Sequence, residues 1–365
     1  MQALSKRYWR IKYSLAISEV IYILLILFLF LNFGLSKKIS ISIFSLTGYK
    51  YIRVIIYLLV IYLIYSILIF PLDFFQSFIL EHKFHLSNQK LIDWFKDWLK
   101  QKFIFYIISL ILIEFFYFSL SYSPRYWWIL ISGFWILLSL ILAKLIPIFI
   151  LPLFFKYKRL NDEDLRERII KLANRMKIAL LDVFEIDLSK KTLKANAAFV
   201  GLGKSKRVLL ADTLKGKYTP QEIELILAHE FSHYRLAHLL KLIFLEACLI
   251  TSNFYIIYGT VGYFLKKYHL ISLEDLASLP IIFIYFIIWA IVTSPLKNFI
   301  SRIFEKNADI LAIKITGLKE DFISLMEKIS LQNLSDRNPP PIIKFFFFDH
   351  PPIDERIKLI NKLDL

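Results

Sequence analysis

Residues 219–265 read TPQEIELILAHEFSHYRLAHLLKLIFLEACLITSNFYIIYGTVGYFL, and this stretch decides the fold. It joins a polar segment to a long apolar one. Thr219-Pro220 is a helix start, with Thr as the N-cap and Pro at the first helical position. Nothing in the residue pattern breaks the helix between Gln221 and Lys241. The sequence therefore predicts one continuous helix that leads from His229-Glu230-Phe231-Ser232-His233 directly into a membrane span.

The H-E-x-x-H pattern within this stretch predicts a metal site. On a helix, His229 and His233 are one turn apart on one face, so both imidazoles can reach one Zn²⁺. Glu230 lies beside that place and can act as a general base toward water. This is the chemistry of a zinc peptidase. The alternative is a helix whose two histidines only face solvent or a polar contact in the core.

A zinc peptidase needs a third protein ligand and an open fourth position. Downstream, Glu305 and Asp309 are again four residues apart on one helical face. Glu305 could bind the metal, and Asp309 could accept the second N–H of a ligating histidine and so fix its tautomer. Taken alone, Glu305 would more often be a surface carboxylate on an amphipathic helix.

The composition indicates a membrane protein. The chain has 365 residues, of which 57% are hydrophobic and 17% aromatic. The formal charge of +16 could suggest nucleic acid, but the Lys and Arg residues flank apolar runs, as expected beside an anionic membrane surface. We therefore expect a lipid bilayer and no nucleic acid as partners. Cys248 is the single cysteine, which excludes an intrachain disulfide and a thiolate metal cluster.

Six segments have the roughly 20 apolar residues that a transmembrane helix needs. They are Ser14–Gly34, Arg53–Phe75, Lys102–Tyr122, Tyr126–Ile148, Leu239–Leu265 and Ala277–Ile300. Glu114 and Glu246 are acidic residues within these spans, where they usually face a cavity or the bundle interior. On a continuous helix, Glu246 could line a polar chamber above the metal, or it could pair with a donor on a neighbouring helix.

The polar block before the fifth span reads as an α+β unit. An amphipathic helix is expected from Asp162 to Met176, capped by Asn161. Val183–Asp187 and Arg207–Leu210 read as strands, with Ala197–Val200 as a third at a sheet edge. Two further helical segments follow the sixth span, at Glu305–Gln332 and Pro351–Lys362.

We expect four regions in the chain. Residues 1–150 form a bundle of four transmembrane helices, and 151–238 form the first part of a catalytic domain with H-E-x-x-H. Residues 239–300 form a transmembrane hairpin, and 301–365 complete the catalytic domain with the third ligand. Loops rich in Lys and Arg place both termini and the metal motifs on the cytoplasmic side of a multi-pass membrane protein. The fold class is a mainly α membrane protein, a six-helix transmembrane bundle with a cytoplasmic-side α+β zincin-like domain.

The chain resembles the type I C-a-a-X prenyl protease family, which are integral-membrane zinc metallopeptidases. The resemblance covers about residues 50–362. It rests on Leu80–Gln89, Ile150–Phe154, Ala195–Gly201 (N-A-x-x-x-G), Arg207–Leu214 ending in D-T-L, Arg302–Asp309 (R-x-x-E-x-x-A-D), and His350-Pro351-Pro352 with Arg356.

The resemblance implies a role for each matching residue. His229, His233 and Glu305 would bind one Zn²⁺ per chain, Glu230 would be the general base and later the proton donor, and Asp309 would hold a ligand in place. The resemblance also implies roles for three residues outside the helix motifs. Asn196 would bind the substrate backbone beside an edge strand, His350 would polarise the scissile carbonyl, and Arg356 would hold a substrate carboxylate or brace the site. Structural roles without a function in catalysis stay open for these three residues: Asn196 as a turn residue, His350 as a cap, and Arg356 as a surface charge.

Substrate choice stays open in the sequence. We count six spans where eukaryotic members are usually assigned seven, and the missing one would fall after the first helix. Peptides or proteins at the membrane are the expected substrates, with prenylated C-a-a-X chains as one class. A heat-shock-type membrane quality-control protease is the alternative within the same chemistry. A non-catalytic transporter or scaffold that uses Glu114 and Glu246 is the alternative from another class.

Overall fold

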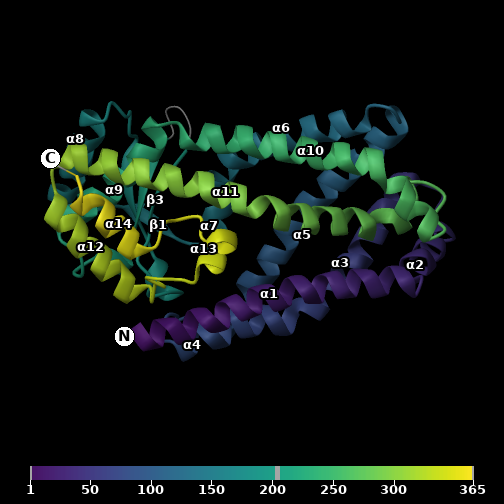
Figure 1. Ribbon diagram of the computed structural model, residues 1–365, viewed down its shortest axis with the longest axis horizontal. Coiled ribbons are helices and arrows are strands. Elements are labelled where there is room, and N and C mark those ends of the chain that lie inside the picture. Colours follow the sequence, from purple (N-terminus) through teal and green to yellow (C-terminus); the bar gives the residue numbers. More distant parts are fainter. Residues whose placement is uncertain (1, 202–205, 364–365) are drawn as a thin grey trace.

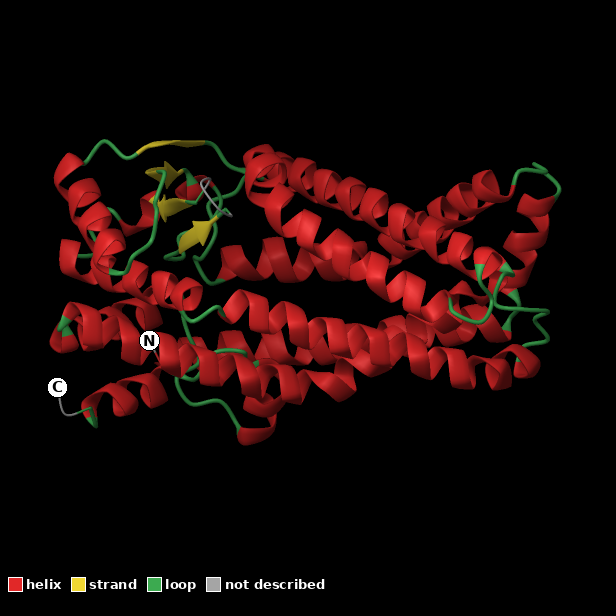
Figure 2. Cartoon of the chain, turned by 90° about the horizontal axis from the view of Figure 1, so that it is seen from above, coloured by secondary structure: helices red, strands yellow, loops and turns green. Residues whose placement is uncertain are grey.

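The structure is a computed structural model that describes residues 2–201 and 206–363. The molecule is elongated (Figure 1). Helix α1 (Gln2–Asn32) begins, and helix α14 (Ile353–Asn361) ends, at the end that carries a small β-sheet, here called the sheet end. Long helices connect it to the opposite, far end, where α2 (Leu35–Phe44) lies. Figure 2 shows the strands gathered at one end while helices run along the whole length.

In the described part of the chain, six helices are long and apolar enough to cross a membrane, which confirms the predicted number of spans and the mainly α membrane class. They are α1 (Gln2–Asn32), α3 (Lys50–Phe74), α5 (Leu91–Tyr122), α6 (Trp127–Leu145), α10 (His238–Lys267) and α11 (Leu279–Thr316). Several extend beyond the predicted ends. The 38 residues of α11 span about 57 Å, roughly twice the 30 Å core of a bilayer, so its C-terminal part belongs to the sheet end.

Short elements modify these helices. Five-residue π-helical turns, η1 (Phe75–Ile79) and η2 (Ile146–Ile150), lead from α3 and α6 into α4 (Leu80–Lys83) and α7 (Leu151–Phe154). Helix α2 follows the first span, at the place where eukaryotic members of the resembled family would have an additional span. With ten residues it is about 15 Å long, too short to cross a bilayer.

The sheet has four strands in the order β1-β2-β4-β3, namely β1 (Tyr157–Arg159), β2 (Asp182–Ile186), β4 (Arg207–Ala211) and β3 (Ala197–Val200). β2 and β4 are parallel, whereas β1–β2 and β3–β4 are antiparallel. Strand β3 lies at the sheet edge, which confirms the prediction. β1 was not predicted because its three residues are too few to show an alternating pattern.

Helix α8 (Glu163–Arg175) lies where an amphipathic helix was predicted, but its cap differs. The carboxylate of Asp162 accepts the backbone N–H of Leu165 at 3.0 Å, so Asp162 and not Asn161 is the N-cap. The two candidates are adjacent acceptors of similar capping strength, and only the backbone geometry separates them.

Helix α9 (Pro220–Arg235) begins as predicted, with a complete capping box. Thr219 Oγ1 accepts the N–H of Glu222 at 3.2 Å, and the Glu222 carboxylate accepts the N–H of Thr219 at 2.8 Å. Ile223, Leu227 and Phe231 are buried on one face against the sheet-end core. Burying such side chains stabilises the fold by roughly 1.5–3 kcal/mol each.

The expectation of one continuous helix from Gln221 to Lys241 is wrong. Helix α9 ends at Arg235, and α10 begins at His238 after Ala237, whose φ of 53° is left-handed. An alanine in this conformation is strained. The break between the helices places His238 in a buried position, where it stacks on Phe304 of α11 with ring centroids 4.3 Å apart. This contact offsets the strain at Ala237.

The rest of the sheet end is helical. Helices α12 (Lys319–Gln332), α13 (Pro341–Phe347) and α14 follow α11. The first predicted segment contains two helices, the end of α11 and α12, because Gly317 ends α11 in a left-handed conformation. The second predicted segment corresponds to α14, and α13 between them was not predicted.

Candidate active site

Three side chains from two helices converge at the sheet end. His229 and His233 lie on α9, and Glu305 lies on α11, which packs along α9. One ligand atom from each lies within 4.8 Å of the others. The two histidine Nε2 atoms are 3.1 Å apart, His229 Nε2 is 3.2 Å from Glu305 Oε2, and His233 Nε2 is 3.2 Å from Glu305 Oε1.

These three groups fit a tetrahedral metal ion. Bonds of 2.0–2.1 Å at tetrahedral angles place ligand atoms roughly 3.3 Å apart, close to the three distances found. Glu305 Oε2 is buried and makes no hydrogen bond of good geometry among the described residues. Burial would lower the pKa of His229, but Asp309 and Glu305 outweigh it and raise the pKa to about 10. The cleft therefore favours positive charge at this place, which a proton or a metal cation can supply.

Asp309 holds the first histidine, as expected. Its side chain is fully buried, and Oδ1 accepts from His229 Nδ1 at 2.9 Å, which turns Nε2 toward Glu305. Arg356 of α14 donates to both oxygens of Asp309, Nε to Oδ2 at 2.8 Å and Nη2 to Oδ1 at 2.6 Å. This bidentate contact corresponds to the bracing role, one of the two roles that the resemblance implied for Arg356.

His238 is a residue that the sequence interpretation missed. Its Nδ1 lies 3.0 Å from Nδ1 of His233, so each of the two histidines has a buried partner behind it. With the His233 Nδ1 turned to His238, its Nε2 faces Glu305. The sequence did contain a third histidine near the motif, since His238 follows His233 by five residues. The expectation of an unbroken helix placed it on a different face.

A cleft of about 160 Å³ opens beside these groups and is lined by Glu230, His350, Arg356 and Asn196 together with apolar side chains. The structure thus brings every predicted site residue to one place. His350 is half-exposed, and its Nε2 lies 3.3 Å from Glu305 Oε1. A hydrogen bond with Asp349 raises the pKa of His350, although burial opposes this. Asn196 is exposed at the start of β3.

The loop that carries His350 is tied to α11. Arg302 donates from Nη1 to the carbonyl oxygens of Lys344 and Phe348, at 3.1 and 2.6 Å. Asn298 donates to Phe346 O at 2.6 Å. Since Arg302 and Glu305 are neighbours on α11, the same helix positions both a candidate ligand and the loop with His350.

Sequence comparison identifies the family from the whole chain. The sequence profile described as Peptidase family M48 matches residues 159–364, more than half of the chain. The profile described as CAAX prenyl protease N-terminal, five membrane helices, matches residues 3–156. The chain belongs to peptidase family M48. It is therefore a multi-pass membrane metalloprotease, and the transporter or scaffold alternative no longer applies.

Individual members of the M48 family are similar over most of their length. The chain is 30% identical to a Bacillus subtilis protein described as the uncharacterized metalloprotease YhfN, over 92% of this chain and 79% of that one. It is also 30% identical to CAAX prenyl protease 1 of Saccharomyces cerevisiae, over 80% and 68%. The crystal structure of S. mikatae Ste24p superposes with a TM-score of 0.88 at 24% identity, covering 98% of this chain and 88% of that one, and so shares the fold.

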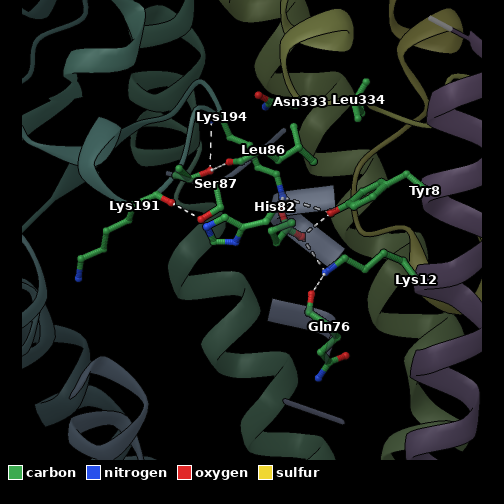
Figure 3. Close-up of polar contacts among 12 residues, drawn as sticks. Tyr8, Lys12, Gln76, His82, Leu86, Ser87, Lys191, Lys194, Asn333 and Leu334 are labelled. Atoms are coloured by element: carbon green, nitrogen blue, oxygen red, sulfur yellow. Dashed lines mark hydrogen bonds and ion pairs between the residues drawn. The ribbon is translucent and has the colours of Figure 1, made fainter. Parts of the chain in front are cut away.

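Residues 80–89 of this M48 chain contact both α1 and the segment of Lys191 and Lys194 that precedes Asn196 (Figure 3). Leu86 O accepts the N–H of Leu193 at 3.0 Å, and Ser87 forms a β-bridge with Thr192. Glu81 accepts from Tyr8 at 2.6 Å and pairs with Lys12 at 2.9 Å and Lys194 at 2.8 Å. These contacts fix the chain just before Asn196 to both α1 and α4.

Glu246 is not among the residues that line the cleft. It is more than half exposed, and its Oε1 pairs with Lys297 of α11 at 3.0 Å. Of the two predicted alternatives, the structure agrees with pairing to a donor on a neighbouring helix. The break at Ala237 also separates Glu246 from the helix that carries His233.

Proposed function

We propose that this chain is a zinc endopeptidase that hydrolyses peptide bonds in membrane-associated substrates, with His229, His233 and Glu305 as the zinc ligands. The observation that supports it most directly is the convergence of these three ligands within 4.8 Å beside a cleft lined by Glu230. Two nitrogens and one carboxylate, with a fourth position open, are the ligand set of catalytic zinc sites.

The protein groups supply positioning and proton transfer. A zinc ion held by these ligands would polarise a carbonyl and lower the pKa of water. Glu230 takes the proton of the attacking water and passes it to the leaving amine. His350, whose pKa is raised by Asp349, donates a hydrogen bond to the carbonyl oxygen as it becomes negative. Asp309 and Arg356 keep His229 in one orientation.

The cleft favours an extended peptide with an aliphatic side chain. Among the described strands, β3 has a neighbour on one side only, so its other edge can pair with a substrate backbone next to Asn196. Much of the cleft wall is apolar: Leu214, Leu225, Ile226, Phe322, Leu325, Met326 and Ile329. Its volume of about 160 Å³ suits one branched aliphatic side chain. A C-a-a-X sequence carries such side chains after its cysteine, and several relatives are named CAAX prenyl proteases.

We place the sheet end on the cytoplasmic side. The N-terminal part of α1, before its membrane part, contains Lys6, Arg7, Arg10 and Lys12. The same N-terminal part contacts the sheet end, because Ser5 and Trp9 both donate to the carbonyl oxygen of Leu334. Positive charge flanking the first span is retained on the cytoplasmic side.

Cleavage of a farnesylated C-a-a-X peptide by detergent-purified protein tests the proposal, with the unprenylated peptide and Glu230→Gln beside it. Loss of the general base should lower kcat by at least ~10²–10⁴-fold, while bound zinc, measured by elemental analysis, stays at one per chain. A Glu230→Gln variant that cleaves at the parental rate would refute the mechanism.

The same experiment separates the substrate alternatives. Preference for the prenylated peptide supports C-a-a-X processing. Equal cleavage of both peptides supports a broader membrane endopeptidase of the heat-shock type. If neither is cleaved although zinc is bound, the metal site stands and the substrate class is wrong.

A further inference from the structure

A pocket lies at the far end of the molecule, at the opposite end from the cleft. Its walls come from α2, from the start of α3, from α5 and from the turn that joins α10 to α11. Figure 1 shows α2 and this turn at the same end of the molecule. The volume of the pocket is about 420 Å³, which is within the range of about 300–1,000 Å³ for small-ligand sites.

Arg53 brings an unpaired positive charge to this pocket. Its guanidinium lies over the ring of Phe44, with Cζ 4.3 Å from the ring centroid. Nη2 donates to the carbonyl oxygen of Gly48 at 3.0 Å, and the enclosed Nε has no partner among the described residues. The nearby carboxylate of Glu274 pairs with Lys50 instead, at 3.0 Å. Since a guanidinium has five N–H donors, most of those of Arg53 stay available for an anion.

Asp275 brings an unpaired negative charge to the same pocket. Its Oδ1 accepts from the backbone N–H of Ala277 at 2.9 Å and from Ser40 Oγ at 3.2 Å, and no cation of the described residues pairs with its carboxylate. Tyr117 also lines the pocket, is fully buried, and has a hydroxyl group without a hydrogen-bond partner in the described part of the chain. The pocket therefore holds one free charge of each sign and a free hydroxyl group.

The pocket lies at the level where lipid headgroups are expected, because its walls are formed where membrane helices begin and end. Exposed tyrosines mark these helix ends: Tyr49, Tyr51, Tyr122, Tyr126 and Tyr263. Tyrosine is enriched where a bilayer meets water. Ile41, Phe44 and Ile271, which line the pocket, are exposed as well. They can contact the acyl chains of a lipid whose headgroup enters the pocket.

We propose that this pocket binds the headgroup of phosphatidylethanolamine, a zwitterionic phospholipid. The phosphate accepts from the guanidinium of Arg53, and the primary ammonium donates to the carboxylate of Asp275, so both contacts are charge-assisted hydrogen bonds. Phosphatidylglycerol has no ammonium group for Asp275, and the quaternary ammonium of phosphatidylcholine has no N–H to donate. The bound lipid joins α2 and α3 to the turn between α10 and α11.

The test adds short-chain phospholipids to the full-length protein in detergent. Native mass spectrometry measures lipid binding, and thermal melting measures the stabilisation that binding brings. The wild type should bind phosphatidylethanolamine about tenfold more tightly than phosphatidylglycerol or phosphatidylcholine, because only this lipid makes both contacts. Phosphoethanolamine, the same headgroup without acyl chains, should bind more weakly than the lipid.

Two variants each remove one contact. Arg53→Gln should weaken the binding of phosphatidylethanolamine about tenfold or more. Asp275→Asn keeps an oxygen for the N–H of Ala277 but loses the charge, and it should abolish the preference for phosphatidylethanolamine over phosphatidylcholine. Arg125→Gln is the matched control, because Arg125 also lies over an aromatic ring, 5.5 Å from the ring centroid of Tyr126, but does not line the pocket. It should bind lipid as the wild type does.

The inference is overturned if the wild type binds none of the three lipids, binds all three alike, or prefers phosphatidylglycerol. It is also overturned if phosphoethanolamine binds as tightly as the lipid, since the ligand would then be a soluble zwitterion. Unchanged lipid binding in both Arg53→Gln and Asp275→Asn would place the lipid elsewhere. The comparison among lipids needs only the wild type, so it decides even where a variant does not fold.

Discussion

Buried polar side chains differ between the sheet end and the membrane bundle: among the described residues, a sheet-end carboxylate lacks a hydrogen bond at one oxygen at most, as at Glu305 Oε2. At the sheet end, Asp309 is bound by Arg356 and His229, and Glu224 is paired with Arg168 at 2.6 Å. Within the bundle, the carboxylate of Glu114 and the amide of Asn253 have no hydrogen-bond partner among the described residues. Since an enclosed polar atom without a partner costs about 1–3 kcal/mol, the bundle is not arranged for greatest stability. At the sheet end, the paired charges position the candidate metal ligands. In the described part of the bundle, the buried polar atoms of Glu114 and Asn253 have no such role in the packing.

The largest expected effect comes from breaking a charge pair at the sheet end. Arg356→Met removes the arginine partner of the buried Asp309, which keeps only its contact with His229, and should destabilise the protein by about 3–5 kcal/mol. Thermal melting of the purified protein measures it. Arg337→Met is the control, because its partners Glu327 and Asp354 are half-exposed and the loss should be about 1 kcal/mol or less. Equal losses in both variants would remove the distinction between buried and surface pairs.

The next effect concerns metal affinity. His238→Phe keeps a ring stacked on Phe304 but removes the partner of His233 Nδ1. Loss of such an outer partner should weaken zinc binding by roughly 10–100-fold, measured by chelator competition. His269→Phe at the far end serves as the control and should leave the affinity unchanged. Unchanged affinity in His238→Phe would show that the contact with His233 is incidental.

A smaller effect is expected at the start of α9. Thr219→Ala removes half of the capping box and should cost about 1 kcal/mol, seen as a lower melting temperature with zinc still bound. Ser42→Ala in α2 removes an exposed hydroxyl that bonds only within its helix, and little change is expected. A Thr219→Ala variant that loses zinc would show that the cap also sets the position of His229.

The smallest effect is expected inside the bundle. Asn253→Leu replaces an unpartnered amide by an apolar group of similar size, so the melting temperature should stay the same or rise slightly. A clear fall in melting temperature would mean that the amide has a partner in the membrane, and the contrast between the two regions would then be smaller than the structure indicates.

Those parts of the site that depend on local spacing could be predicted from the sequence. His229 and His233, like Glu305 and Asp309, are one turn apart, so their helical faces follow from the period of the helix alone. The edge position of β3 was also predicted, and the strand order confirms it. Local patterns could not place Arg356 against Asp309, because the two are 47 residues apart and meet only through tertiary packing.

The break at Ala237 was hidden for a different reason. Alanine is the best helix former, and no glycine or proline marks the place. The left-handed turn exists because His238 gains contacts with His233 and Phe304, which lie outside the local sequence. The number of spans could be predicted from the sequence, but the lengths of the helices could not, because helices such as α11 continue past the apolar stretch into the sheet end.

This left-handed residue also has a mechanical consequence. A helix whose apolar stretch is longer than the bilayer is thick accommodates the mismatch by tilting or kinking. Ala237 separates α10 from the helix that carries His229 and His233, whereas α11 continues past Pro295 to Glu305 as one helix. We therefore expect a tilt of α11 to reach Glu305 more directly than a tilt of α10 reaches the two histidines.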